Sequence, residues 1–352
     1  MTGIPFEQSL KIKQLSKDFF ESIYPSWTWP DGSIVPGGVL MAFAAAAAYE
    51  TLEDDWAIDT LQSHFLLGPD ATVPLRFKVQ RLSDGGRFAV RAVEVLQGGK
   101  VVCFVTCSFV RPKSLHGPSM QHTVSRATDL KVSSITLDDL ASTSSSSSQG
   151  NRWMQFQRLG VVFPPHQTND PHPSSTPSPS KGIYTSVGTI PSLNSFPPTN
   201  NNTNTNSNNK NNQKLHALGL IALSDYHVLD GPPHLHSLTT NQPPIGQNPT
   251  TSTTPPTRKS DFQRLTSLNH NIHFRLHEGF QASELCYVEV TSAWTGARRG
   301  GISSRIFTPS GELIACCFQE GYFVLFDGGD AAGDEKKGDG DANEKKKGGS
   351  KL

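Results

Sequence analysis

Two glycines at the start of an expected helix are the first residues whose position indicates chemistry. Gly37 and Gly38 follow Pro36 and lead into the apolar run VLMAFAAAAAYETL at 39–52. Alanine has the highest helix propensity and proline is tolerated in the first helical turn, so this run is predicted to be a helix. N–H groups at a helix N-terminus bind anions, which makes Gly37 and Gly38 candidates for binding a substrate oxyanion or phosphate. Close packing of the helix on a sheet explains the two glycines equally well.

The cysteines and histidines do not indicate a metal site. All cysteines fall within apolar, strand-like runs that lack the paired spacing of zinc ligands, and none has a neighbour that indicates a lowered thiol pKa. His270 and His273 lie on one expected strand at a spacing that turns them to opposite sides, so we interpret them as sheet-surface residues. No metal and no cofactor is predicted. Buried, reduced thiols are expected at Cys103, Cys107, Cys286, Cys316 and Cys317.

The composition limits the classes of protein. The 352 residues have a formal net charge of +0 at pH 7, which does not favour a nucleic-acid binder. No apolar run reaches the roughly 18 residues that indicate a transmembrane helix, and the N-terminal residues lack the order of a signal peptide. We expect a soluble protein without a membrane span that is not secreted by the signal-peptide route. The hydrophobic fraction of 35% is low, so part of the chain is expected to be unfolded connector.

Hydrophobic patterning is confined to islands separated by segments rich in Ser, Pro, Asn and Thr. A small island at 152–163 carries several large apolar residues and is expected to dock on a domain. The composition shifts predict an N-terminal domain at 14–112, a low-complexity linker at 113–213, a C-terminal domain at 214–326 interrupted by a disordered insert at 231–260, and a flexible tail at 327–352.

The two patterned domains repeat the same order of elements. In the first, the helix at 39–52 is followed by strand-like runs that are divided at 84–86 and 98–99 by Gly-containing turns typical of hairpins. In the second, a helix is expected at 216–229 and strands again follow it. A helix over one face of an antiparallel sheet, present twice, is therefore the predicted architecture. The expected strands cover 65–82, 86–97, 99–110, 267–276, 284–294, 300–311 and 312–326.

The same segments resemble a known family. The strings LSDYHVL, TSLNHNIHF, TSAWTGARRG and IFTPSGELIACCFQEG, in this order across 214–326, resemble the type II acyl-CoA thioesterases, as a peroxisomal member of fungal type. The first domain resembles them more loosely, through PGGVLMAFAAAAAYET, LQSHFLLGPD and RLSDGGRFAVRAVEVLQGGKVV. The resemblance implies an α+β fold of two tandem hot-dog domains, in each of which an antiparallel sheet wraps around a long helix. It also implies an acyl-CoA substrate.

The resemblance implies a catalytic set in the second domain. The family's Asp, hydroxyl and amide fall on Asp225, Ser267 and Gln319. Thioester hydrolysis needs a water held against the carbonyl carbon, an acceptor for its proton and donors to the oxygen that gains charge, and these residue types supply them. Thr266 lies beside Ser267, and strand alternation leaves open which of the two hydroxyls faces the site. The first domain has no Asp at the position equivalent to Asp225, so we expect it to be catalytically degenerate.

Two alternative functions are open at this point. A hot-dog enoyl-CoA hydratase uses an Asp and a His close together after a Gly, and residues 230–234, DGPPH, resemble this arrangement with a spacing one residue short. The other alternative is a non-catalytic acyl-CoA-binding scaffold. The insert at 231–260 does not by itself exclude a working site, because loop closure costs only about 0.6 kcal/mol per doubling of loop length.

The last three residues predict a location and a partner. Ser350, Lys351 and Leu352 form the tripeptide that is read as a peroxisomal address. The preceding tail alternates acidic and Lys-rich clusters with Gly, which favours an extended tether. We expect an enzyme of the peroxisomal matrix that binds acyl-CoA and the import receptor, with further pairing of chains into a homodimer.

Overall fold

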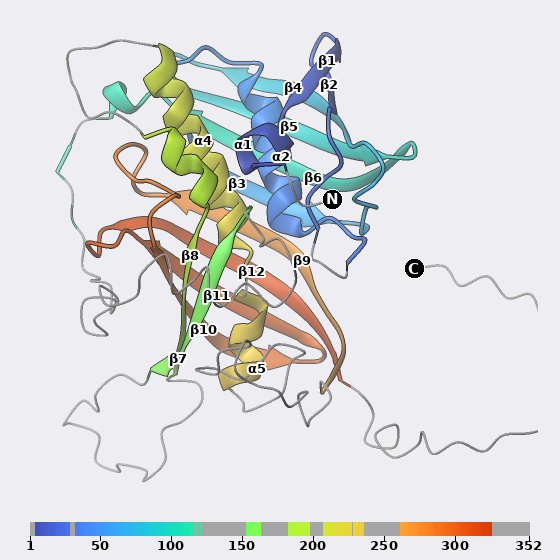
Figure 1. Ribbon diagram of the computed structural model, residues 1–352, viewed down its shortest axis with the longest axis vertical. Coiled ribbons are helices and arrows are strands. Elements are labelled where there is room, and N and C mark those ends of the chain that lie inside the picture. The colour runs from blue at the N-terminus through green and yellow to red at the C-terminus, as the bar shows by residue number, and fades with distance from the viewer. Residues whose placement is uncertain are drawn as a thin grey trace, which may run out of the picture.

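The computed structural model describes residues 4–28, 32–115, 117–118, 120, 153–162, 182–197, 207–226, 228–235 and 261–325. Within these ranges, twelve strands form one antiparallel sheet, and two long helices cover one of its faces (Figure 1). The first half of the chain supplies α1 (Phe6–Ser9), β1 (Ile12–Ser16), β2 (Phe19–Ser22), α2 (Gly37–Tyr49), β3 (Ala57–Phe65), β4 (Arg76–Asp84), β5 (Phe88–Gln97) and β6 (Lys100–Val110). The second half supplies β7 (Gln155–Val162), β8 (Ile183–Thr189), α4 (Ser207–Ser224), α5 (Gly231–Leu235), β9 (Phe262–Phe274), β10 (Cys286–Gly296), β11 (Arg299–Phe307) and β12 (Leu313–Leu325).

The strand order is symmetric about the centre of the sheet. It runs β1-β2-β4-β5-β6-β3-β9-β12-β11-β10-β8-β7, so both halves have the same order when counted outward from the central pair. In each half, two strands precede the long helix and four follow it. β3 and β9 join the halves through a ladder centred on Gln62 opposite Asn271. The predicted tandem hot-dog domains are confirmed, and the two domains share one continuous sheet.

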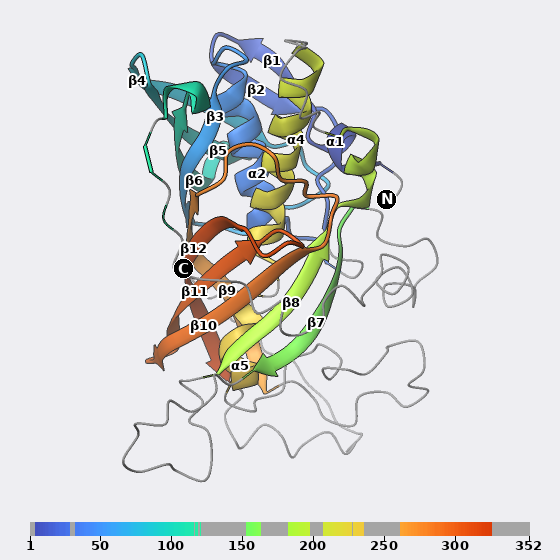
Figure 2. The same cartoon turned by 90° about the vertical axis from the view of Figure 1, so that its left-hand side faces the viewer.

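The Ala-rich helix α2 is buried on all sides. Every residue from Gly38 to Ala45 and from Ala47 to Tyr49 is buried. Alanine side chains are short, so β4, β5 and β6 can approach the helix on one side while α4 packs beside it (Figure 2). The helix predicted at 39–52 is therefore confirmed, beginning slightly earlier, at Gly37, and ending at Tyr49.

The predicted linker at 113–213 is wrong in part, because it contains two strands of the second hot-dog. β8 pairs with β10, and β7 pairs with β8 at the edge of the sheet. All residues of β8 are buried, but its sequence IYTSVGT mixes apolar with small polar residues and lies between low-complexity segments, which hid the strand. The island at 152–163 does dock as expected, since Trp153 stacks on Trp27 with ring centroids 5.3 Å apart. The second domain therefore begins near β7 and not at residue 214.

Other predicted boundaries also move. The first domain begins before residue 14, at β1, and the expected strand at 65–82 is divided between the end of β3 and β4. The helix α4 ends at Ser224, before the predicted 229. The first residues of the predicted insert form α5, which is buried, while 236–260 and the tail at 327–352 lie outside the described residues. None of the helices in the described ranges is long and apolar enough to cross a membrane.

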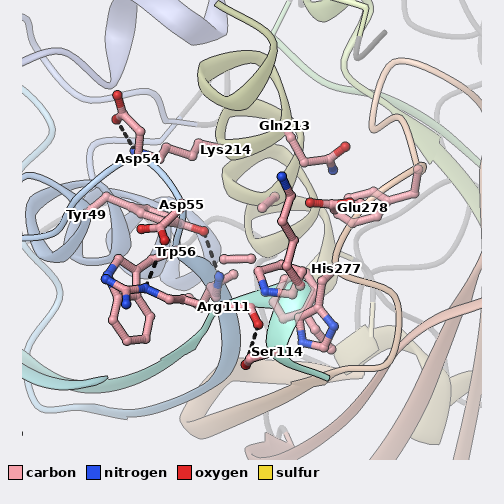
Figure 3. Close-up of a pocket in the computed structure, with 17 residues that line it drawn as sticks. Tyr49, Asp54, Asp55, Trp56, Arg111, Ser114, Gln213, Lys214, His277 and Glu278 are labelled. Carbon is pink, nitrogen blue, oxygen red and sulfur yellow. Dashed lines mark hydrogen bonds and ion pairs between the residues drawn. The ribbon is translucent and has the colours of Figure 1, made fainter. Parts of the chain in front are cut away.

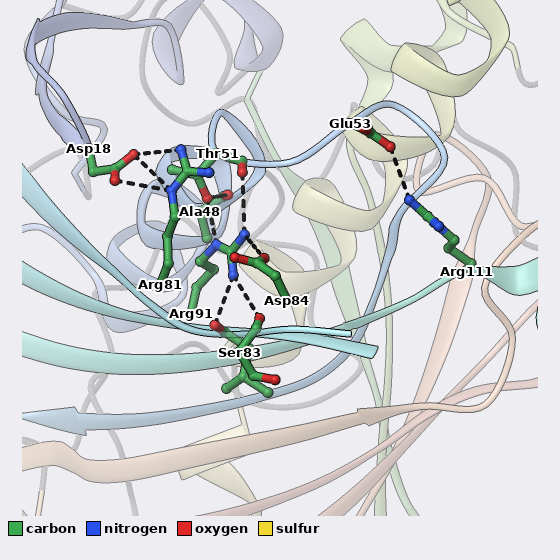
Figure 4. A network of polar contacts seen from close by, with 10 residues as sticks. Asp18, Ala48, Thr51, Glu53, Arg81, Ser83, Asp84, Arg91 and Arg111 are labelled. Carbon is green, nitrogen blue, oxygen red and sulfur yellow. Dashed lines mark hydrogen bonds and ion pairs between the residues drawn. The ribbon is translucent and has the colours of Figure 1, made fainter. Parts of the chain in front are cut away.

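A buried arginine ties the end of α2 to the sheet (Figure 4). Arg91 of β5 is 1% exposed, and its Nε donates to the Oγ1 of Thr51, just beyond α2, at 2.7 Å. Its Nη1 donates to the carbonyl oxygen of Ser83 at 3.0 Å, and its Nη2 donates to the Asp84 carboxylate. A buried guanidinium is tolerated only when its donors are satisfied, so these contacts fix where the helix ends.

We expect Arg91→Ala to lower the free energy of unfolding by about 3 kcal/mol, because it leaves buried carbonyl groups without donors and removes a large buried side chain. Arg81, which pairs with Arg91 across the two strands and forms an exposed ion pair with Asp18, is the matched control. Arg81→Ala should cost less than about 1 kcal/mol. Chemical denaturation of both variants measures the difference, and equal losses would contradict the structural role of Arg91.

Candidate active site

The carboxylate of Asp225 lies where the two long helices meet. Asp225 directly follows the last residue of α4, and its Oδ2 accepts a hydrogen bond from the backbone N–H of Gly38 at 2.8 Å. A Cβ on Gly38 would lie 2.5 Å from the carbonyl oxygen of Ala222, and one on Gly37 would lie 2.8 Å from Asp225 Oδ2. Both glycines are therefore required for this close approach. The Gly38 N–H at the helix N-terminus is therefore bonded to a side chain of the protein, and the substrate-binding role predicted for the two glycines stays a prediction.

The three residues of the predicted catalytic set lie together. Ser267 Oγ is 3.2 Å from Asp225 Oδ1, to which it donates, and Gln319 Nε2 donates to the same oxygen at 2.7 Å. Gln319 Nε2 also contacts Ser267 Oγ at 2.5 Å. Asp225 comes from the end of α4, Ser267 from β9 and Gln319 from β12, the strand that pairs with β9. With Gly38 from α2, the cluster draws on both halves of the chain.

A β-bulge determines which hydroxyl faces the cluster. His270 pairs with Gln319, and Ser267 pairs with Gly321, so β9 has one residue more than β12 between these two pairs. Directly opposed residues of an antiparallel pair lie on the same face of the sheet, and the extra residue reverses the alternation along β9. Ser267 therefore shares the inner face with His270, whereas Thr266 is exposed. The sequence left open which of the two hydroxyls faces the cluster, and in the structure it is that of Ser267.

His270 is an inner residue, and its interpretation as a sheet-surface histidine was wrong. Its side chain is 0% exposed, and its Nε2 lies 3.0 Å from Ser224 Oγ, on the last residue of α4. The buried residues Ile272 and Phe274 alternate with it on the same strand face. That apolar alternation was the signal in the sequence that placed His270 inside. Its partner Ser224 was not singled out, because only the folded chain brings the two together.

Burial sets the electrostatics of the cluster. It raises the pKa of Asp225 above the ordinary carboxyl value, while the nearby His270 and the hydrogen bonds from Gly38, Gln319 and Ser267 act in the opposite direction. Burial also lowers the pKa of His270, an effect that Asp225 and Gln319 partly offset. Gln319 Oε1 is buried and finds no hydrogen-bond partner among the described residues. The cluster thus places two acceptors beside each other, the Asp225 carboxylate and the Gln319 amide oxygen.

The prediction of buried, reduced cysteines is confirmed except at Cys316, which is partly exposed. All of them are free, and the other four are buried. Burial is the main cause that raises the pKa of Cys103 to about 12, to which the charge of Asp225 adds. Burial likewise raises the pKa of Cys286 and of Cys317 to about 12. None of these three thiols is a nucleophile at neutral pH.

The segment that resembles a hydratase is held in structural contacts. Asp230 is buried, and its backbone carbonyl oxygen lies 2.8 Å from His234 Nδ1. The other ring nitrogen of His234, Nε2, lies 3.3 Å from Nη1 of Arg158 on β7. Because both ring nitrogens are engaged, His234 is not presented as a free base.

Two antiparallel half-sheets wrapped around long helices, with an Asp, a hydroxyl and an amide at a helix end, define a double hot-dog protein of the thioesterase class. Family models support this assignment. The acyl-CoA thioesterase N-terminal domain matches residues 25–110, and the acyl-CoA thioesterase C-terminal domain matches residues 195–323. The chain belongs to the acyl-CoA thioesterase family.

Individual relatives agree with the family models. Acyl-coenzyme A thioesterase 8 of Mus musculus is 24% identical over 325 residues, which cover 90% of this chain and 88% of the mouse protein. Its Homo sapiens counterpart is 22% identical over 317 residues, which cover 89% and 86%. An acyl-CoA thioesterase II from Mycobacterium marinum shares the fold with a TM-score of 0.57 at 20% identity, covering 92% of this chain and 98% of that chain. A hot-dog protein of unknown function from Alicyclobacillus acidocaldarius has a TM-score of 0.58 at 12% identity, covering 91% and 98%.

The hydrogen bonds at Asp225 predict how its pKa responds to mutation. The carboxyl should titrate above the ordinary aspartate pKa, because burial outweighs the groups that favour its ionised form. Ser267→Ala removes one donor to the carboxylate and should move the midpoint further up. Thr266→Ala, at the exposed neighbour, is the matched control and should leave it unchanged. The ¹³Cγ chemical shift of Asp225, followed with pH by NMR, measures all three midpoints, and a downward move in Ser267→Ala would contradict the assigned donor.

Proposed function

We propose that the chain hydrolyses fatty acyl-CoA thioesters to free fatty acid and CoA through a water molecule activated by Asp225, Ser267 and Gln319. The observation that carries this proposal is the hydrogen-bonded cluster of these three side chains at the junction of α2 and α4. Membership of the acyl-CoA thioesterase family supports the substrate class.

Asp225 acts as the general base in this proposal. Its carboxylate accepts one hydrogen of the water, while the amide oxygen of Gln319 accepts the other and turns the water oxygen toward the thioester carbon. As the O–H bond breaks, a C–O bond forms and the carbonyl oxygen becomes an oxyanion. Collapse of this intermediate breaks the C–S bond, and the proton held by Asp225 passes to the leaving sulfur. One water is consumed, and the products are a carboxylic acid and the CoA thiol.

The oxyanion needs a donor that Asp225 does not already use. We assign this role to the backbone N–H of Gly37, which precedes Gly38 in the first turn of α2, where N–H groups have no partner within the helix. The Gly38 N–H is engaged by Asp225 and stays with the base. In this proposal only Gly37 binds the substrate, through its N–H to the oxyanion, whereas Gly38 holds the base Asp225.

Asp225→Asn and Gln319→Ala should each lower the rate of thiol release by about 100-fold or more, because they remove the proton acceptor and the residue that orients the water. Asp70→Asn, at an exposed aspartate outside the cluster, is the control and should leave the rate unchanged. Release of free CoA thiol from a panel of acyl-CoAs measures the effect and gives the preferred chain length.

Other outcomes of the same assay would contradict the proposal. Unchanged turnover in Asp225→Asn would show that the base is elsewhere. Hydration of an enoyl-CoA without thiol release would indicate the hydratase, and binding of acyl-CoA with neither reaction would indicate the scaffold.

We further propose that the enzyme works in the peroxisomal matrix and that it is of the fungal type. The first proposal rests on Ser350, Lys351 and Leu352, which lie outside the described residues. The pairing of chains into a homodimer also stays a prediction.

A chain that ends at Gly349 should stay in the cytosol, whereas the full chain should enter peroxisomes, because the import receptor binds the terminal tripeptide. Fluorescence microscopy of both chains, fused at their N-termini to a fluorescent protein, compares their locations. A truncated chain that still reaches peroxisomes would show that the tripeptide is incidental.

A further inference from the structure

A cavity of about 420 Å³ opens at the other end of the two helices, away from Asp225 (Figure 3). Its floor is apolar and buried, and its rim carries Arg111, Lys214 and acidic side chains. Cavities of this size with an apolar lining and a few polar groups are typical of small-molecule sites. The residues that form the floor are Tyr49, Trp56, Ile58, Ala217, Phe274 and Phe280.

This cavity is the symmetry counterpart of the catalytic cluster. α2 ends at Tyr49, and α4 ends at Ser224, the residue before Asp225. Tyr49 Oη accepts a hydrogen bond from the N–H of Ile58 at 2.8 Å. Ile58 lies on β3 just before a bulge in its pairing with β6, and Ser267 lies on β9 just before the bulge in its pairing with β12. Ile58 therefore occupies the place of Ser267. Counted from the helix ends, the counterpart of Asp225 is Glu50, which is exposed, and the buried Tyr49 before it contacts Ile58.

The third position follows from the same register. Leu61, three residues after Ile58, pairs with Cys107 of β6, just as His270 pairs with Gln319 of β12. Cys107 thus stands where Gln319 stands in the other half. Burial raises the pKa of the Tyr49 hydroxyl and of the Cys107 thiol, so neither is a base at neutral pH. The equivalent positions of this half hold Ile58, Cys107 and the exposed Glu50, and a cavity opens beside them.

A cation lies at the rim of this cavity. Lys214 lies on α4 beside Tyr49, and its ammonium is 5.4 Å from the centre of the Tyr49 ring. Its ion pair with Asp54, at 2.9 Å, joins a side chain that is 16% exposed to one that is 54% exposed. Because the Asp54 carboxylate stays largely in water, a ligand carboxylate can take its place at Lys214.

From these features we infer that the cavity binds a free fatty acid without transforming it, with its chain on the apolar floor and its carboxylate at Lys214. The inference rests on the proposed function, because that reaction releases a fatty acid. Arg111, held by Glu53 and Asp55 over the Trp56 ring, closes the wall of the cavity beside the chain. The two symmetric positions thus have different tasks, hydrolysis at one and binding of the product class at the other.

Calorimetric titration with dodecanoate tests the inference. Ile58→Trp fills the floor and should remove one equivalent of bound dodecanoate while leaving thiol release intact. Lys214→Glu should weaken dodecanoate binding at this site at least tenfold, and it changes only a rim residue, so it decides the matter if Ile58→Trp does not fold. Lys100→Glu, at an exposed hairpin lysine, is the matched control for charge and should bind as the wild type does.

A second titrant, a non-hydrolysable thioether analogue of dodecanoyl-CoA, distinguishes the two sources of an acyl chain. Unchanged dodecanoate binding in both cavity variants would overturn the inference. A loss confined to the thioether analogue would also overturn it, because the occupant would then be a thioester. Failure of the proposed function gives a different result, since thiol release would be absent from every variant while the difference in dodecanoate binding persisted.

Discussion

The contact between the Gly38 N–H and the Asp225 carboxylate is the constraint on which the rest of the structure depends. It joins the beginning of one long helix to the end of the other, and therefore one hot-dog to its partner. The contact requires glycine at both Gly37 and Gly38, because a Cβ at either position would overlap the other helix or the carboxylate. The Ala-rich surface of α2 serves the same purpose along the rest of the helix, where any larger side chain would separate the helix from the sheet.

The shared sheet explains why one half can lose its chemistry without losing its fold. The positions of Asp225, Ser267 and Gln319 are set by a helix end, a bulge and a strand register, and all three features recur in the first half. Tyr49, at the end of α2, bridges helix and strand there through a bond to a backbone N–H. The bulge and the strand register recur in both halves, although the side chains at the equivalent places differ.

Local patterning predicted most of the fold, and the resemblance predicted the site residues. The helix at 39–52 and the Gly-punctuated hairpins follow from propensity and alternation, which are local properties. β8 was missed because its burial comes from neighbours distant in sequence and leaves little apolar periodicity in IYTSVGT. The choice between Thr266 and Ser267 depends on a bulge, which adds one residue to a strand without a signal in its composition. The contact between Gly38 and Asp225 spans 187 residues, so no local pattern contains it.

The position of Asp225 balances opposing electrostatic effects. The negative end of the α4 dipole and the loss of water both disfavour the carboxylate, whereas the positive end of α2 and the donors on β9 and β12 favour it. A carboxylate fully stabilised by its donors would be a weak base, and one without them would be protonated and unable to accept a proton. A general base works best when its pKa lies near the working pH. Burial therefore raises the pKa of Asp225, and the donors from both halves of the chain act against that rise. In the proposed reaction, this balance sets how readily Asp225 takes a proton from water.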